Sequence, residues 1–209
     1  MRERKEKPIS MMTDVKINAE ACINAEYKIN ANERIDDLCR DNLKLIQNTD
    51  VFCFGMDAVL LSTFAKAGKN DKVLDLGTGN GIIPILMQAK NPGGMYTGLE
   101  IQDISFNLAA RNVSLNNLSD HVNMVQGDIK EASRIFGGAS FNVVTSNPPY
   151  MNENHGIVNP ESAKAIARHE LLCSLEDVVR EASKCLKVKG HMYMVHRPSR
   201  LVDIFTSMK

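Results

Sequence analysis

A glycine-rich segment in the middle of the chain has the composition of a ligand-binding loop. It holds Gly77, Gly79 and Gly81, begins at Asp75 and leads into an apolar run that starts at Ile82. Glycine lacks a Cβ atom, so it lets a ribose or an amino-acid group approach the backbone, and it tolerates positive φ angles. A helix beginning after the loop would add free N–H donors for a carboxylate. We therefore predict that this loop binds a ligand.

The glycine spacing differs from that of a dinucleotide-binding loop. The pattern G-x-G-x-x-G would require Gly or Ala at position 82, where this chain has Ile. An ordinary tight turn is the alternative for the isolated segment.

Two further acids stand at the ends of predicted strands. Glu100 is placed to accept hydrogen bonds from a ribose diol, as an acid about 20 residues after such a loop does in nucleotide sites. Asp128 is placed to accept from an adenine amine. A solvated strand-end acid is the alternative for Glu100, and a helix N-cap is the alternative for Asp128.

The most specific segment is Asn147, Pro148, Pro149 and Tyr150. Two consecutive prolines fix φ at about −65° and remove two N–H donors, so the loop is stiff and its carbonyls point outward. An aryl or amide NH₂ is a poor nucleophile, and oxygen acceptors around its hydrogens would hold it as the nitrogen turns toward sp³ geometry. The Asn147 side-chain oxygen and the Pro148 carbonyl form such a pair. Tyr150 offers a flat face for a base, which is worth about 1–3 kcal/mol in nucleic-acid binders. A polyproline turn without function is the alternative.

The candidate residues above lie at or just after the ends of short apolar segments. These segments are typical of strands, and segments of helix length separate them. This alternation predicts a doubly wound, mostly parallel α/β sheet, in which ligands bind beyond the carboxyl ends of the strands, where the strand order reverses. The glycine loop, Glu100 and the Asn-Pro-Pro-Tyr segment should therefore meet at one edge. The predicted strands are Lys72–Leu76, Met95–Glu100, Val122–Gln126, Phe141–Ser146 and His191–His196.

The segments between these strands show the apolar spacing of helices. We expect a helix over Asp57–Lys66 ahead of the first strand, and two further helices with an inward apolar face. The first face comprises Ile101, Ile104, Leu108 and Leu115, and the second comprises Leu171, Leu175, Val178, Val179, Ala182 and Leu186.

The length and composition fit one domain. A chain of 209 residues with 44% hydrophobic residues can bury one sizeable core. We place this domain at residues 33–209, after a polar and weakly ordered arm at residues 1–32 in which Ile-Asn-Ala-Glu occurs twice. No run of about 18 apolar residues indicates a membrane span, and no targeting segment is evident, so we expect a cytoplasmic protein.

The charge balance and the cysteines bear on whether the protein binds nucleic acid or metal ions and whether it forms disulfides. Lys plus Arg equals Asp plus Glu at 25 each, so contact with nucleic acid must come from a local patch. Five cysteines without a C-x-x-C pair suggest neither a metal site nor a disulfide framework. The candidate basic patch comprises Arg180, Lys184, Lys187, Lys189, Arg197 and Arg200; a solvated helix face is the alternative.

The glycine loop, with its spacing D-x-G-x-G-x-G, resembles motif I of class I S-adenosylmethionine-dependent methyltransferases. The Asn-Pro-Pro-Tyr segment resembles that of amino-methyltransferases, which act on adenine N6, guanine N2 or the glutamine amide. Other segments resemble the tRNA1(Val) adenine-N6 methyltransferase family over residues 33–201. These segments are 33–38, 43–47, 52–61, 167–170 and 196–198.

The resemblance implies a Rossmann-like fold, S-adenosylmethionine as cofactor and methyl transfer to N6 of an adenine in tRNA. It assigns Asp75, Gly77, Gly79, Gly81, Glu100 and Asp128 to the cofactor, and Asn147, Pro148, Pro149 and Tyr150 to the target amine, with Asn147 also near the cofactor. It implies that the segment around Phe54, Gly55 and Asp57 packs over the cofactor site. A role for His169 is left open, since a helix histidine is more often structural.

Two departures from the family pattern are visible. Met56 stands where the family commonly has a small hydroxyl residue. The chain stops at Lys209, whereas family members continue into an antiparallel strand pair. We expect this pair to be missing, with an unpaired edge strand and a monomer or weak dimer as the result.

Three other functions remain open at this point. A protein glutamine methyltransferase would use the same Asn-Pro-Pro-Tyr segment. A nicotinamide oxidoreductase is disfavoured by Ile82. A non-catalytic protein would bind S-adenosylmethionine without methylating anything.

Overall fold

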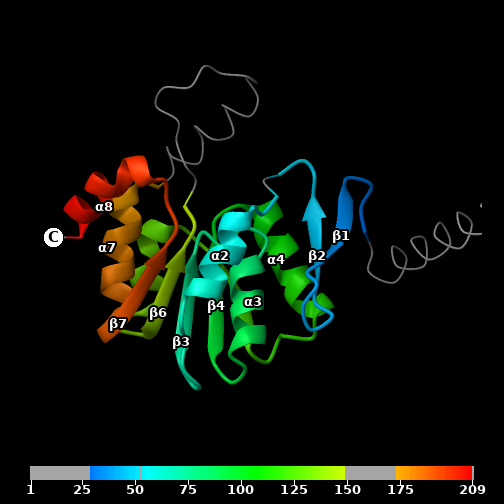
Figure 1. The fold of residues 1–209 in the computed structure, drawn as a ribbon, viewed down its shortest axis with the longest axis horizontal. Helices are drawn as coiled ribbons and strands as arrows, with labels where there is room; N and C mark the ends of the chain where they lie inside the picture. The colour runs from blue at the N-terminus through cyan, green and yellow to red at the C-terminus, as the bar shows by residue number, and fades with distance from the viewer. Residues whose placement is uncertain (1–28, 52, 149–172, 209) are drawn as a thin grey trace, which may run out of the picture.

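The computed structural model describes residues 29–51, 53–148 and 173–208, and its fold is drawn in Figure 1. Five parallel strands form one sheet in the order β5-β4-β3-β6-β7. The chain therefore runs outward from β3 to one edge and then returns to the other side of β3. The strand order reverses between β3 and β6. The strands are β3 (Lys72–Leu76), β4 (Met95–Glu100), β5 (Val122–Gln126), β6 (Phe141–Ser146) and β7 (Leu186–Met194).

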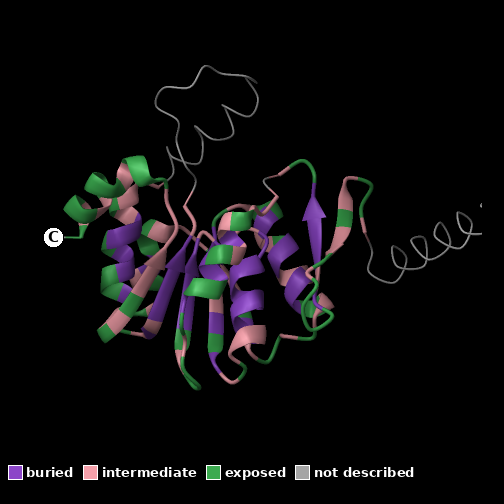
Figure 2. Cartoon of the chain, viewed as in Figure 1, coloured by how far each residue is buried: buried purple, intermediate pink, exposed green. Residues whose placement is uncertain are grey.

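The predicted doubly wound α/β fold is confirmed, and four predicted strands have the observed bounds. For the central strands β3 and β6, the agreement follows from burial on both faces, which makes central parallel strands nearly continuous apolar runs. In β3, Val73, Leu74 and Leu76 are all buried, and Figure 2 shows β3 and β6 as mostly buried strands.

Helices cover both faces of the sheet. One apolar cluster joins α2, α3 and α4 to residues such as Val73, and a second joins α5 and α7 to residues such as Leu74. Alternate residues of β3 therefore pack into apolar clusters on opposite faces of the sheet, because successive side chains of a strand point to opposite faces. The helices are α2 (Met56–Phe64), α3 (Ile82–Lys90), α4 (Asp103–Leu115), α5 (Ala132–Phe136), α7 (Leu175–Cys185) and α8 (Leu201–Ser207), with short 3₁₀ turns η1 (Ile129–Glu131) and η2 (Pro198–Arg200).

Several details of the sequence prediction are wrong. The helix predicted over Asp57–Lys66 runs from Met56 to Phe64, and Leu186, predicted on a helix face, lies in a strand. The last strand begins at Leu186, five residues before the predicted His191, because Leu186 pairs with Phe141 ahead of an irregularity in the β6–β7 register. In α4, Ile104 is 58% exposed, and the inward face instead includes Ser105, Ala109 and Asn112. The inward face of α4 is more polar than the apolar spacing suggested.

An antiparallel pair at the start of the domain was not predicted. It consists of β1 (Glu33–Asp37) and β2 (Lys44–Asn48). The hairpin lies beside α4 in Figure 1, and the Arg111 guanidinium of α4 donates to both Glu33 carboxylate oxygens at 2.7 and 2.9 Å. Glu33 and Arg34 gave a polar start to β1, so the hydrophobic alternation that would mark a strand is weak here.

Candidate cofactor and acceptor site

The glycine loop leaves β3 and makes a tight turn into α3. Gly77, Gly79 and Gly81 have φ angles of 73°, 59° and 84°, in the left-handed region that side chains disfavour. The amides of Gly77 and Thr78 both donate to the Leu99 carbonyl at 3.0 Å, so the loop is held against the end of β4. These are the positive φ angles that glycine permits in a tight strand-to-helix turn.

Glu100, at the end of β4, shapes the loop directly. Its side chain is buried, Oε2 accepts from the Gly79 amide at 2.9 Å, and Oε1 accepts from the Gln102 amide at 2.9 Å. Each carboxylate oxygen has a second lone pair. Glu100 can therefore hold the loop and still accept from hydroxyl groups of a ligand.

Asp75 is a buried carboxylate under the same loop. The Thr145 hydroxyl donates to its Oδ1 at 2.7 Å, whereas Oδ2 has no hydrogen-bond partner among the described residues. Burial raises the pKa of Asp75 to about 6, and the charge of Glu100 adds to the rise. The hydroxyls of Thr145 and Thr78 oppose that rise in pKa. The Thr78 hydroxyl, however, is not placed well enough to make a hydrogen bond with the carboxylate. An unmatched acceptor of this kind suits a ligand with a donor group.

The space around the loop differs from glycine to glycine. A Cβ built at Gly79 would meet no atom within 4 Å, so this part of the loop is open. A Cβ at Gly98 in β4 would lie 2.7 Å from Thr78 Cγ2, so only glycine lets the loop pack so closely against β4. The contacts of Gly98 with the loop and of Thr145 with Asp75 were not predicted from the sequence. A glycine inside a strand pattern, which marks close backbone approach, was the available signal for Gly98.

Asn147 and Pro148 follow β6 at the same edge of the sheet. Ser146 is in register with Leu76, and its hydroxyl donates to the Leu76 carbonyl at 2.9 Å. Asn147 and Gly77 are thus the next residues after a hydrogen-bonded pair on adjacent strands. The predicted convergence of the two loops at the point where the strand order reverses agrees with this placement. Pro149, Tyr150 and His169 lie outside the described residues.

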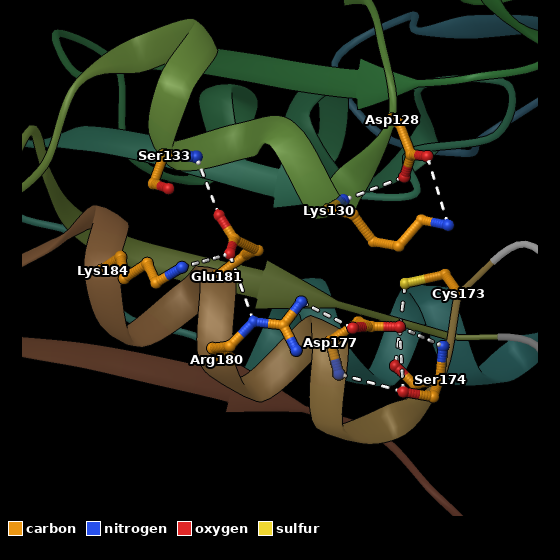
Figure 3. Close-up of polar contacts among 9 residues, drawn as sticks. All are labelled: Asp128, Lys130, Ser133, Cys173, Ser174, Asp177, Arg180, Glu181 and Lys184. Atoms are coloured by element: carbon orange, nitrogen blue, oxygen red, sulfur yellow. Dashed lines mark hydrogen bonds and ion pairs between the residues drawn. The ribbon is translucent and has the colours of Figure 1, made fainter.

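Asp128 follows β5 and forms the N-cap of η1. Its Oδ1 accepts from the Lys130 amide at 2.9 Å, and Oδ2 lies 3.6 Å from Lys130 Nζ, as Figure 3 shows. The N-cap alternative raised from the sequence is therefore part of its role. A contact with the cofactor stays a prediction.

Several residues of the candidate basic patch are engaged with acids. Glu181 is buried and accepts from the Ser133 amide at 3.1 Å, from Lys184 Nζ at 2.8 Å and from Arg180 Nε at 3.4 Å (Figure 3). Arg180 also donates to Asp177 at 2.6 Å. These pairs reduce the charge available to RNA phosphates, so RNA contact at this patch stays a prediction.

Membrane-spanning helices and metal-binding clusters can be assessed only for the residues that the structure describes. Within residues 29–51, 53–148 and 173–208, no helix is long and apolar enough to cross a membrane. In that part of the chain, no cluster of three or more His, Cys, Asp or Glu side chains is arranged to hold a metal ion.

A family model for the methyltransferase small domain matches residues 42–203. The chain belongs to this methyltransferase family. The resemblance stated from the sequence is confirmed, and S-adenosylmethionine is the cofactor of this domain. The open glycine loop, the unmatched Asp75 Oδ2 and the buried Glu100 fit an adenosine-containing ligand with hydroxyl and amino donors. The individual roles of these residues remain proposals.

Curated relatives of this family member carry a specific name. A protein of Porphyromonas gingivalis named tRNA1(Val) (adenine(37)-N6)-methyltransferase is 30% identical over 72% of this chain and 60% of its own length. A Flavobacteriaceae protein of the same name is 26% identical over 71% of this chain and 61% of its own length. The chain thus spans about 60% of the length of these relatives.

Solved structures share the fold. A predicted O-methyltransferase from Agrobacterium tumefaciens superposes with a TM-score of 0.57 at 21% identity, covering 73% of this chain and 66% of that one. TrmN from Thermus thermophilus superposes with a TM-score of 0.52 at 22% identity, covering 70% and 40%. The methyltransferase domain therefore has the Rossmann-like arrangement of this class.

Proposed function

We propose that this protein transfers a methyl group from S-adenosylmethionine to the exocyclic N6 of an adenine in tRNA. The observation that carries the proposal is the register of β3 and β6, which sets Asn147 beside the glycine loop. The relatives named tRNA1(Val) (adenine(37)-N6)-methyltransferase support the choice of substrate.

In this proposal, the glycine loop after β3 binds the cofactor and the loop after β6 binds the acceptor. When bound, S-adenosylmethionine supplies an electrophilic methyl group on a sulfonium. Gly77, Gly79 and Gly81 admit the cofactor to the backbone, Glu100 accepts from its ribose, and Asp75 accepts from a donor that reaches Oδ2. These contacts orient the cofactor toward the end of β6.

The acceptor amine is held by the loop that follows β6. The Asn147 side-chain oxygen and the Pro148 carbonyl accept hydrogen bonds from the two amine hydrogens, and Tyr150 stacks on the base. Extruding an adenine costs a few kcal/mol. Alignment of the amine with the methyl group lowers the barrier by about 7–11 kcal/mol, so the chemistry requires neither a metal nor a covalent nucleophile.

The test uses Asn147→Ala. We expect S-adenosylmethionine affinity, measured by calorimetry, to change little, while turnover falls by about 10²–10³ through loss of one transition-state hydrogen bond. The assay supplies labelled S-adenosylmethionine and total tRNA from a methylation-deficient strain, and then maps the modified base. Asn123→Ala, an exposed asparagine in β5, is the matched control and should retain full turnover.

Three results would overturn the proposal. An unchanged rate in Asn147→Ala would remove the amine-holding role. Label in a protein glutamine, with none in tRNA, would make this a protein amide methyltransferase. Tight cofactor binding without transfer to either acceptor would leave a binding protein that is not an enzyme.

A further inference from the structure

A buried asparagine of α4 joins the glycine loop to the β1–β2 hairpin. Asn112 is fully buried, and its Nδ2 donates to the Asn80 carbonyl at 2.9 Å and to the Ile46 carbonyl at 3.1 Å. Its Oδ1 accepts from the Ile46 amide at 2.7 Å. A carboxamide has two donor hydrogens, so both are used within the protein. One side chain thereby connects two segments that are otherwise distant in the sequence.

The Asn80 carbonyl belongs to the peptide group that directly precedes Gly81. The amide of that same peptide group donates to the Thr78 carbonyl at 3.0 Å. The peptide plane is thus held on both sides, just before Gly81 enters the left-handed region at φ 84° and α3 begins. Rotation of this plane would change the loop and leave a buried carbonyl without a partner, which is costly.

We propose that Asn112 is a positioning residue for S-adenosylmethionine binding. It orients the Asn80 carbonyl and thereby the glycine loop, and it makes the shape of that loop depend on the docked hairpin. The inference rests on the proposed function only in that the loop binds S-adenosylmethionine. It does not depend on which acceptor is methylated.

Asn116 provides a matched control one helical turn later. Its Oδ1 accepts from the Lys44 amide at 2.9 Å, and its Nδ2 donates to the Lys44 carbonyl at 2.7 Å and to the Asn112 carbonyl at 2.8 Å. Asn112 and Asn116 therefore make the same two-bond pairing with alternate residues of β2. They differ in the third bond, because that of Asn112 goes to the glycine loop.

The experiment compares Asn112→Ala with Asn116→Ala in the full chain. Urea unfolding should show a loss of stability in both variants, since each removes two bonds to β2. The loss should be larger in Asn112→Ala, because its bonds are buried whereas those of Asn116 are part-buried. Calorimetry should show an S-adenosylmethionine Kd about tenfold weaker in Asn112→Ala and within about twofold of the unaltered protein in Asn116→Ala. Equal changes in the two Kd values would overturn the inference. Failure of the unaltered protein to bind S-adenosylmethionine would overturn the proposed function as well.

A second measurement needs no substitution. In the unaltered protein, saturating S-adenosylmethionine should slow hydrogen exchange of the Gly81 amide and of the Ile46 amide, each by about tenfold or more. The Lys44 amide, which donates to Asn116, should change by less than about twofold. A slowed Gly81 amide beside an unchanged Ile46 amide would show that loop and hairpin are not coupled, and the inference would be wrong even if Asn112→Ala failed to fold.

Discussion

Replacing Asp75 by asparagine should stabilise the ligand-free protein at neutral pH, and the gain should depend on pH. Asp75 is buried, and its Oδ2 has no partner among the residues that the structure describes. Asparagine keeps an oxygen that accepts from the Thr145 hydroxyl, and it places an amide donor where Oδ2 lies. The substitution therefore removes a buried charge without removing the observed hydrogen bond.

The magnitude follows from the pKa of the carboxyl group. Burial raises the pKa of Asp75 to about 6 from an ordinary value of 3.8. At about 1.4 kcal/mol for each tenfold change in proton affinity, the difference corresponds to about 3 kcal/mol. Between about pH 4 and pH 6, the folded state holds a proton that the unfolded chain has released, so rising pH lowers the stability of the unaltered protein. Asp75→Asn has no carboxyl group at this position, so its stability should not fall with pH for this reason.

Urea unfolding at pH 4 and at pH 7.5, without ligand, measures the effect. The advantage of Asp75→Asn over the unaltered protein should grow by about 2–2.5 kcal/mol between these two values, because at pH 4 the unfolded chain has already released part of its proton. Asp120→Asn, which changes an exposed carboxylate, should show no such growth. An Asp75→Asn advantage that is equal at both pH values, or that shrinks at pH 7.5, would refute the reasoning.

Three further predictions concern other parts of the site and of the elements that support it. Glu100→Gln should weaken S-adenosylmethionine binding by about 10–100-fold in calorimetry, because hydrogen bonds to a charged acceptor are worth about 1.5–3 kcal/mol; unchanged affinity would contradict a role in binding. Gly81→Ala should destabilise more than Gly79→Ala in urea unfolding, by about 1–2 kcal/mol, since its Cβ would lie 3.0 Å from the Met124 side chain; equal losses would count against this packing. Glu181→Gln should cost about 3 kcal/mol at pH 7, because hydrogen bonds from Lys184 and Ser133 outweigh burial and hold the pKa of Glu181 to about 2. That cost should be present above about pH 4.5 and disappear as pH falls toward 2; a cost independent of pH would contradict the account.

The central strands and the loops that follow them could be predicted from the sequence. In β3 and β6, most residues on both faces are buried, and the residues to which we assign the chemistry lie at or directly after the ends of the strands. The carboxyl ends of parallel strands meet at one edge, so local patterns were enough to bring Gly77 and Asn147 together. The spacing of apolar residues therefore predicts the position of a strand well where both faces of the strand are buried.

The hairpin and the inward face of α4 could not be predicted because their contacts are polar and distant in sequence. Asn112 is buried by hydrogen bonds to Ile46, 66 residues away, and apolar spacing carries no information about such a pairing. Ile104 was assigned inward on spacing alone, yet it is exposed. The partner of Asp75 was missed for the same reason, since Thr145 lies on a different strand.

The docking of β2 on α4 also has a consequence for the order of folding. The hairpin leaves the ribosome before α4, yet the side chains that pair with it, Asn112 and Asn116, are made about 70 residues later. Contacts of such long range can form only when a large loop of the chain is closed, which costs conformational entropy. We therefore expect the hairpin to dock only after α4 has been synthesised, and the glycine loop to gain its hydrogen bond from Asn112 only then.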